Sequence, residues 1–172
     1  LTAVQTAGIT TDQTGALQTG VLSNLTTTAF AAIGTGVVAG LSGAQVSSLT
    51  SAEITALTTD QAGALTSVQT LGITTDQAAA LTNVQTLGIT TSQVGGLESG
   101  DLNQLTTGAF AALTTAVVSK LASAQVNALG TQQVAALTTA QAKALTTQQA
   151  QGLSSAQVTA IDGTDFVQLS TS

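Results

Sequence analysis

Large aliphatic residues recur at every eighth position along the whole chain. Counted from Leu1, each block of eight residues begins with Leu or Ile, and this holds for 22 of 22 blocks, from Leu1 and Ile9 to Ile161 and Leu169. No insertion or deletion interrupts the frame, and the commonest block is Leu-Thr-Thr-x-Gln-Val/Ala-x-Ala/Gly. We call this block the octad. A short, unbroken repeat of this kind indicates an architecture in which each unit packs on its neighbours.

The polar positions of the octad predict a short helix. If the Thr or Ser at position two is the N-cap, the Gln at position five is the third helical residue, and the two form a capping box. Positions one and six then become the partners of a hydrophobic staple. In one octad, Ser42 and Gln45 would form the box while Leu41 and Val46 form the staple. Gln, Glu or Asp occupies position five in 16 of 21 full octads, so the signal extends along most of the chain.

The octad therefore predicts an all-α solenoid with one very short capped helix per repeat. Such helices are unstable alone and must pack on one another. One continuous helix is disfavoured, because eight residues turn through about 800° and the Leu stripe would drift by about 80° per octad. A β-solenoid is the alternative, since Thr and Val favour strands. Strict alternation is absent, however: Leu1, Ala3 and Gln5 would share one face of a strand.

A longer period of 80 residues lies above the octad. Residues 1–48 align with residues 81–128, and Phe30 aligns with Phe110 in octads that lack the position-five Gln. We expect a single array of about 21 octads over residues 1–172, with no linker between parts. The expected units are residues 1–80, residues 81–160, and a further unit or end segment at residues 161–172.

The composition excludes several classes of function. Only 6% of the residues are charged, and His, Cys, Met, Trp, Tyr and Pro are absent. Without imidazole or thiolate, we expect no catalytic residues, no cofactor, no metal site and no disulfide, and therefore no enzyme and no small-molecule substrate. With Lys120 and Lys143 as the only basic residues and a net charge of −6, nucleic acid is not an expected partner. No run of about 20 apolar residues predicts a membrane span.

A few residues are candidates for particular roles. Asp162-Gly163-Thr164-Asp165 resembles part of a calcium loop, but a calcium site needs more oxygen ligands, so the segment is interpreted as structural. Acids at position four, in the first helical turn, are expected to interact with the helix dipole. These are Asp12, Asp60 and Asp76. Phe30, Phe110 and Phe166 are the candidate assembly contacts, with core filling as the alternative for Phe30 and Phe110.

The segment Leu57–Leu81, LTTDQAGALTSVQTLGITTDQAAAL, resembles the Leu-Thr-Thr-x-Gln repeat regions of large secreted bacterial surface proteins, a group that includes adhesins and extracellular fibre proteins. The likeness covers essentially the whole chain and implies a repeat style rather than an activity. The LTTDQ start is also similar to the opening of TAL-effector DNA-binding repeats, but the rest of that unit and its basic surface are missing.

The resemblance and the unbroken repeat together predict a structural role. We expect a secreted protein at the cell surface that forms or belongs to an extracellular filament, a surface stalk or an adhesin shaft. Its partners would be copies of itself, head-to-tail, with lateral contact as a second option. The array stops four residues into an octad and has no polar capping repeat, which favours such continuation. The alternative function is a binding module that presents ranked Thr side chains to ice or carbohydrate on a β-solenoid.

Overall fold

The computed structural model describes residues 1–169 and consists of short helices joined by single extended residues or short turns. No strand occurs within residues 1–169, so the all-α prediction with one helix per octad is confirmed and the β-solenoid is not supported. Two of the helices, η1 and η2, are of the 3₁₀ type. In chain order the helices are α1 (Ala3–Ala7), η1 (Thr11–Ala16), α2 (Thr19–Leu22), α3 (Thr27–Ala31), α4 (Thr35–Gly40), α5 (Gly43–Ser47), α6 (Ser51–Ala56), α7 (Thr59–Ala64), α8 (Ser67–Leu71), α9 (Thr75–Ala80), α10 (Asn83–Gly88), η2 (Val94–Gly96), α11 (Ser99–Gln104), α12 (Thr107–Ala111), α13 (Thr115–Lys120), α14 (Ser123–Asn127), α15 (Thr131–Ala135), α16 (Thr139–Ala144), α17 (Thr147–Gln151), α18 (Ser155–Ala160) and α19 (Gly163–Leu169).

The predicted capping box starts most of these helices. At α8, the Thr66 Oγ1 accepts from the Gln69 backbone N–H at 3.3 Å, and the Gln69 Oε1 accepts from the Thr66 N–H at 2.7 Å. Each bond satisfies a backbone donor that the helix itself leaves without a partner. Boxes with both bonds start α1, α5, α6, α7, α8, α9, α16, α17 and α18.

Each helix ends where the next octad begins. The Leu at position one has an extended backbone, as at Leu65 with φ −58° and ψ 139°, and its N–H still donates to the carbonyl of Ala62. The following Thr66 is extended too and caps the next helix. No residue in the described part of the chain has a positive φ, so the turn between helices needs no left-handed residue.

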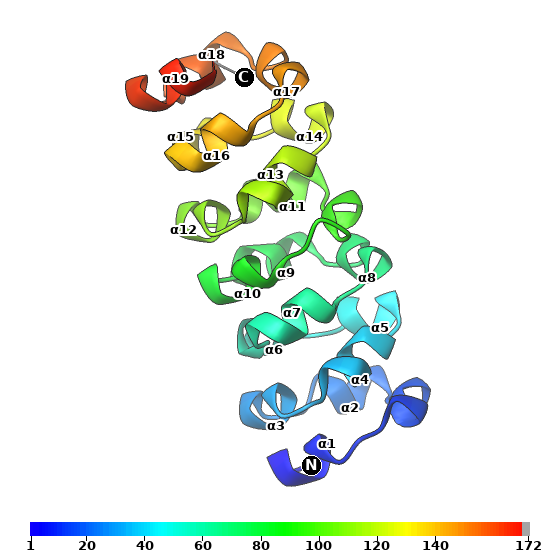
Figure 1. Cartoon of the computed structure of the whole chain (residues 1–172). Helices are drawn as coiled ribbons and strands as arrows, with labels where there is room; N and C mark the ends of the chain where they lie inside the picture. The colour runs from blue at the N-terminus through cyan, green and yellow to red at the C-terminus, as the bar shows by residue number, and fades with distance from the viewer. Residues whose placement is uncertain (170–172) are drawn as a thin grey trace.

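Three octads make one coil of the solenoid. Each helix packs against the helix three octads later, as α3 does on α6, α6 on α9 and α4 on α7. The chain therefore forms three columns of stacked helices, and the stack is elongated with the termini at opposite ends (Figure 1). The octad period alone does not predict how many octads close a coil, and the sequence analysis did not contain this number.

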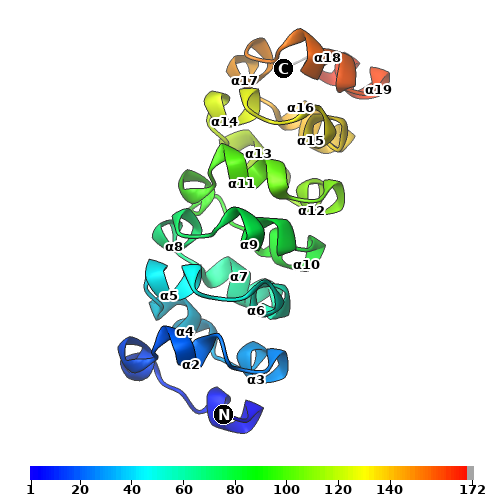
Figure 2. The same ribbon diagram turned by 180° about the vertical axis from the view of Figure 1, so that it is seen from behind.

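The columns wind around the long axis, and this winding accounts for the 80-residue period. In one column, α3 and α6 lie at the left of Figure 1, whereas α14 and α17 lie at the right; Figure 2, from behind, shows the same sides reversed. Ten octads are three coils and one extra octad, and the winding offsets the extra octad. Thus α3 and α12, which are 80 residues apart, lie at the same edge in both figures.

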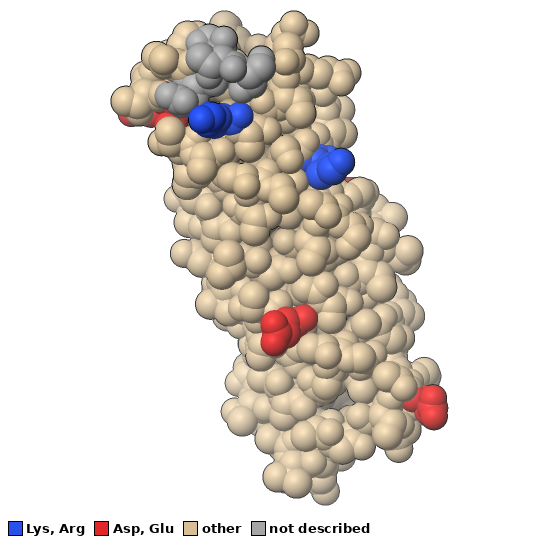
Figure 3. All heavy atoms as spheres, viewed as in Figure 1, with Lys and Arg blue, Asp and Glu red and all other residues tan. Residues whose placement is uncertain are grey.

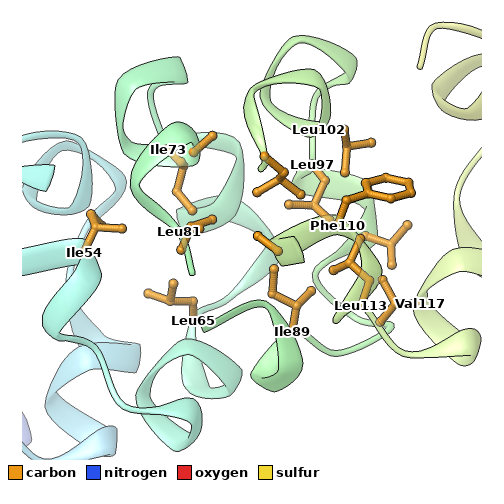
Figure 4. Close-up of a cluster of buried hydrophobic side chains, with 14 of the residues drawn as sticks. Ile54, Leu65, Ile73, Leu81, Ile89, Leu97, Leu102, Phe110, Leu113 and Val117 are labelled. Atoms are coloured by element: carbon orange, nitrogen blue, oxygen red, sulfur yellow. The ribbon is translucent and has the colours of Figure 1, made fainter. Parts of the chain in front are cut away.

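Positions one and six of the octads fill the interior between coils. Leu41 and Val46, the predicted staple partners, are both buried in one continuous core cluster. Figure 4 shows the middle of this core, where Leu97, Leu102 and Phe110 approach one another from neighbouring octads. Aliphatic burial of this kind contributes about 25 cal/mol per Å² and compensates for the instability of each isolated helix.

Candidate assembly surfaces

The Gln at position five joins one coil to the coil before it. While the Gln69 Oε1 completes the capping box of its own helix, the Gln69 Nε2 donates to the carbonyl oxygens of Val38 and Leu41 at 2.8 and 2.7 Å. These carbonyls lie at the end of α4, the helix that leads into the previous coil's neighbouring column, where a helix leaves backbone acceptors without partners. The side chain is 1% exposed, so all of these bonds are made away from water.

This link repeats along the array, with acceptors mostly 28 and 31 or 30 residues earlier in the chain. We call it the amide ladder. Its donors are Gln45, Gln61, Gln69, Gln77, Gln85, Gln93, Gln125, Gln133, Gln141, Gln149 and Gln157. Because every link points toward the N-terminus, the two faces of a coil are different and complementary.

Burial shows the same polarity. Position five lies against the preceding coil, and it is exposed only in the first coil, where Gln5 and Gln13 are solvent-accessible and Val21 is 41% exposed. Position six lies against the following coil, and it is buried in every octad up to Ala142. The exposed position-five side chains of the first coil form what we call the donor face.

The opposite end of the described chain presents the other half of the interface. In the last coil, position six is half-buried at Ala150 and Val158 and 48% exposed at Phe166. These three side chains, with Leu153 and Leu169, line an open groove. We call this surface the acceptor face, because the carbonyl oxygens that a further coil's glutamines would reach belong to the same helices.

The three candidate Phe residues divide between core and surface. Phe30 and Phe110 are both 0% exposed and belong to the core cluster, so their side chains fill the interior of the chain and are not available to a second molecule. The expectation that these two make assembly contacts is thereby corrected, and the core-filling alternative applies. Phe166 occupies the same octad position but lies on the acceptor face, and it stays a candidate contact.

Acids replace Gln at position five in three octads. Glu53, Asp101 and Asp165 are buried, with exposed fractions of 1%, 6% and 7%. A carboxylate can accept the capping bond but cannot donate to the preceding coil. One oxygen of Glu53 and one of Asp165 are buried without a hydrogen-bond partner. Burial, and then the charge of Glu98, raises the pKa of Asp101 above the usual range of aspartate.

The remaining acids act as local helix signals. Asp162 accepts hydrogen bonds from the Thr164 hydroxyl and N–H at the start of α19, and these bonds lower the pKa of Asp162. The acids at position four, Asp12, Asp60 and Asp76, are exposed in the first turns of η1, α7 and α9. Within residues 1–169, no three His, Cys, Asp or Glu side chains come together in a way that could hold a metal.

The sides of the solenoid are largely uncharged. Figure 3 shows Lys, Asp and Glu widely separated on one face by uncharged surface. Exposed apolar pairs occur on two helices: Val68 and Leu71 on α8, and Val84 and Leu87 on α10. Among residues 1–169, no helix has the length and apolar character required to cross a bilayer.

The amide ladder was missed in the sequence, although a signal for it was present. Glu satisfies a capping box as well as Gln does. Position five nevertheless carries 13 Gln and only one Glu and two Asp among the full octads. That preference for an amide indicates that the side chain must donate as well as accept, which requires a second helix to receive the bond.

Comparison with known proteins agrees with this repeat structure. The sequence profile of the ALTTAQ repeat matches residues 30–67, 94–131, 107–139 and 118–147, which together cover more than half of the chain. The hexapeptide of that name occurs unchanged at Ala136–Gln141. No match was found among curated proteins or among solved structures. The chain is a helical repeat protein and belongs to the ALTTAQ repeat family.

Proposed function

We propose that this repeat protein is a structural element of an extracellular bacterial filament, surface stalk or adhesin shaft, and that it lengthens by stacking of coils from end to end. It is secreted, it has no catalytic role, and its principal partner is a further array of the same kind. The proposal needs only a coil with the same octads, so it holds both for a longer chain and for a second copy.

One observation carries the proposal: the donor face and the acceptor face are the two halves of the interface that already joins every pair of coils. Gln5 and Gln13 are oriented as the ladder glutamines are, but this chain supplies no preceding coil to accept from their Nε2 groups. Phe166 lies where the buried Phe30 and Phe110 lie in their own coils. Stacking two such arrays would therefore bury apolar surface and form new amide links without requiring a new kind of contact.

Other features support the extracellular setting and the mechanical role. The chain has no Cys and few charges, and its sides are covered by Thr, Ser, Ala and Gly, which suits close packing in a fibre. Side-to-side contact between arrays would use the exposed pairs on α8 and α10. The resemblance to repeat regions of secreted surface proteins supports localisation outside the cell.

The test is electron microscopy and analytical ultracentrifugation of the purified 172-residue chain over a range of concentrations. We expect end-to-end oligomers or filaments whose width matches one solenoid. Phe166→Asp, on the acceptor face, should shorten or abolish them. Val84→Asp places the same charge on a side of the solenoid and is the matched control, which should leave end-to-end length unchanged. Monomers at all concentrations, or equal effects of the two substitutions, would contradict the proposal.

Localisation has a separate test. Antibodies against the purified chain should label the surface of intact cells that produce the protein, or should detect it in the culture medium. Detection only after the cells are broken would argue against an extracellular structural role.

A further inference from the structure

Glu53 holds a place in the amide ladder that its side chain cannot fill when ionised. It lies at position five of α6, is 1% exposed, and its Oε2 accepts from the Thr50 N–H at 2.7 Å and from the Thr50 hydroxyl at 2.8 Å. Its Oε1 is buried and has no hydrogen-bond partner. In a ladder Gln the corresponding atom is Nε2, which donates to the preceding coil.

The acceptors that face this atom follow from the ladder. Ladder glutamines reach carbonyl oxygens 28 and 31 residues earlier, as Gln69 reaches Leu41 and Val38. For Glu53 the same offsets lead to the carbonyls of Leu25 and Leu22, in the turn that precedes α3, and α3 packs on α6. An ionised carboxylate oxygen directed at carbonyl oxygens is unfavourable, because both are acceptors and both carry negative charge.

We propose that Glu53 is a proton-operated link between two coils. When the Oε1 carries a proton, its O–H donates to the carbonyl oxygen of Leu25 or Leu22 and completes the ladder, while the Oε2 keeps both bonds to Thr50. When the carboxyl is ionised, the link is absent and the charge is buried beside the carbonyls. Acid therefore tightens this joint of the solenoid, and alkali loosens it.

The surroundings of Glu53 offer no compensating cation. The two helices stacked on α6 are α3, which has no charged residue, and α9, whose one charged side chain is the exposed Asp76. The helices before and after α6 in the chain are α5, which is uncharged, and α7, which carries the exposed Asp60. Both neighbouring charges are negative, so they favour the protonated form.

The experiment compares urea unfolding of the 172-residue chain, followed by helical circular dichroism, between pH 8 and pH 4. Glu53→Gln supplies a permanent donor at the same place. At pH 8 we expect this variant to raise the folding equilibrium constant by about tenfold over wild type, and we expect the difference to shrink as the pH falls. Equal stability of the two proteins at all pH values, or a less stable variant at pH 8, would overturn the proposal.

Two further measurements do not depend on that variant. Gln69→Glu introduces the same carboxyl at a normal ladder position, and it should acquire a loss of stability toward high pH that wild type lacks there. Carbon-13 chemical shifts of the Glu53 carboxyl, measured in the intact chain, should change with pH together with the amide exchange rate of the coil contacts near Leu25. Titration of Glu53 with no change in those exchange rates would show that the proton does not operate the link.

Discussion

The Nε2 of Gln69 lies 2.7 Å from the carbonyl oxygen of Leu41, 28 residues earlier in the chain. This bond explains how units of eight residues can form a stable solenoid. A helix of five or six residues leaves almost all of its terminal N–H and C=O groups unpaired. A primary amide has an acceptor and two donors, so one Gln side chain satisfies the start of its own helix and the end of another.

Replacing Gln69 should show that the ladder stabilises the fold. Gln69→Ala leaves the Thr66 N–H and two buried carbonyls without this partner, and we expect a loss of about 2 kcal/mol in the free energy of unfolding. Gln5→Ala is the control, because Gln5 is exposed and makes only the local capping bond. It should cost about 1 kcal/mol or less. Urea unfolding by circular dichroism measures both, and equal losses would argue against an inter-coil role.

Two adjacent glycines provide a test of close packing between coils. A Cβ added at Gly96 would overlap the carbonyl oxygen of Ser67 and the hydroxyl of Thr70 on α8, whereas a Cβ at Gly95 would meet no atom within 4 Å. We expect Gly96→Ala to destabilise the chain by about 2 kcal/mol, since backbone must move apart. Gly95→Ala should leave stability unchanged or slightly raised. Thermal unfolding of the two variants compares them directly, and a tolerated Gly96→Ala would mean that η2 can shift away from α8.

The two environments of Phe lead to opposite expectations for truncation. Phe110 is fully buried, so Phe110→Ala should lower the free energy of unfolding by about 3–5 kcal/mol. Phe166 is 48% exposed, and Phe166→Ala should cost about 1 kcal/mol or less in a single array. Calorimetry at low protein concentration makes this comparison without contributions from assembly. Similar losses would show that Phe166 is as well packed as Phe110.

The local structure could be predicted from the sequence because its causes are local. The Thr-x-x-Gln spacing and the Leu at position one are sufficient to place the cap and the staple, and Thr66 and Gln69 show the predicted bonds. The burial of Phe30 and Phe110 could not be decided, because position six faces the following coil. The number of octads per coil depends on how neighbouring helices pack at a distance, and no single octad encodes that number.

Interpretation of position five was incomplete for the same reason. Within one octad, Gln45 and Glu53 are equivalent, since both cap the helix. They differ only toward the preceding coil, where Gln45 donates to Leu17 and Glu53 has an oxygen without a partner. The difference in function between the two residue types therefore becomes visible only when the coils are stacked.

Asp101 should make the stability of the array depend on pH. Burial first, and then the charge of Glu98, raises the pKa of Asp101 in the folded chain above the ordinary value of 3.8. The folded state therefore binds this proton more tightly than the unfolded state, so the stabilisation is complete below the ordinary value and is lost as the pH rises through the folded pKa. Asp101 lines a narrow apolar void of about 10 Å³ that also touches Thr70 and Ile73, and this lack of polar partners explains the effect of burial.

Asp101→Asn removes the charge and should flatten this part of the pH profile, with stability above wild type at neutral pH. Glu98→Gln removes only the second cause and should move the loss of stability to lower pH without abolishing it. Asp76→Asn is the control, because Asp76 is exposed in the first turn of α9, and it should leave the slope as it is. Urea midpoints measured from pH 3 to pH 7 compare the four proteins. Since Glu53 is present in all of them, a slope that persists unchanged in Asp101→Asn would assign the pH dependence to another group.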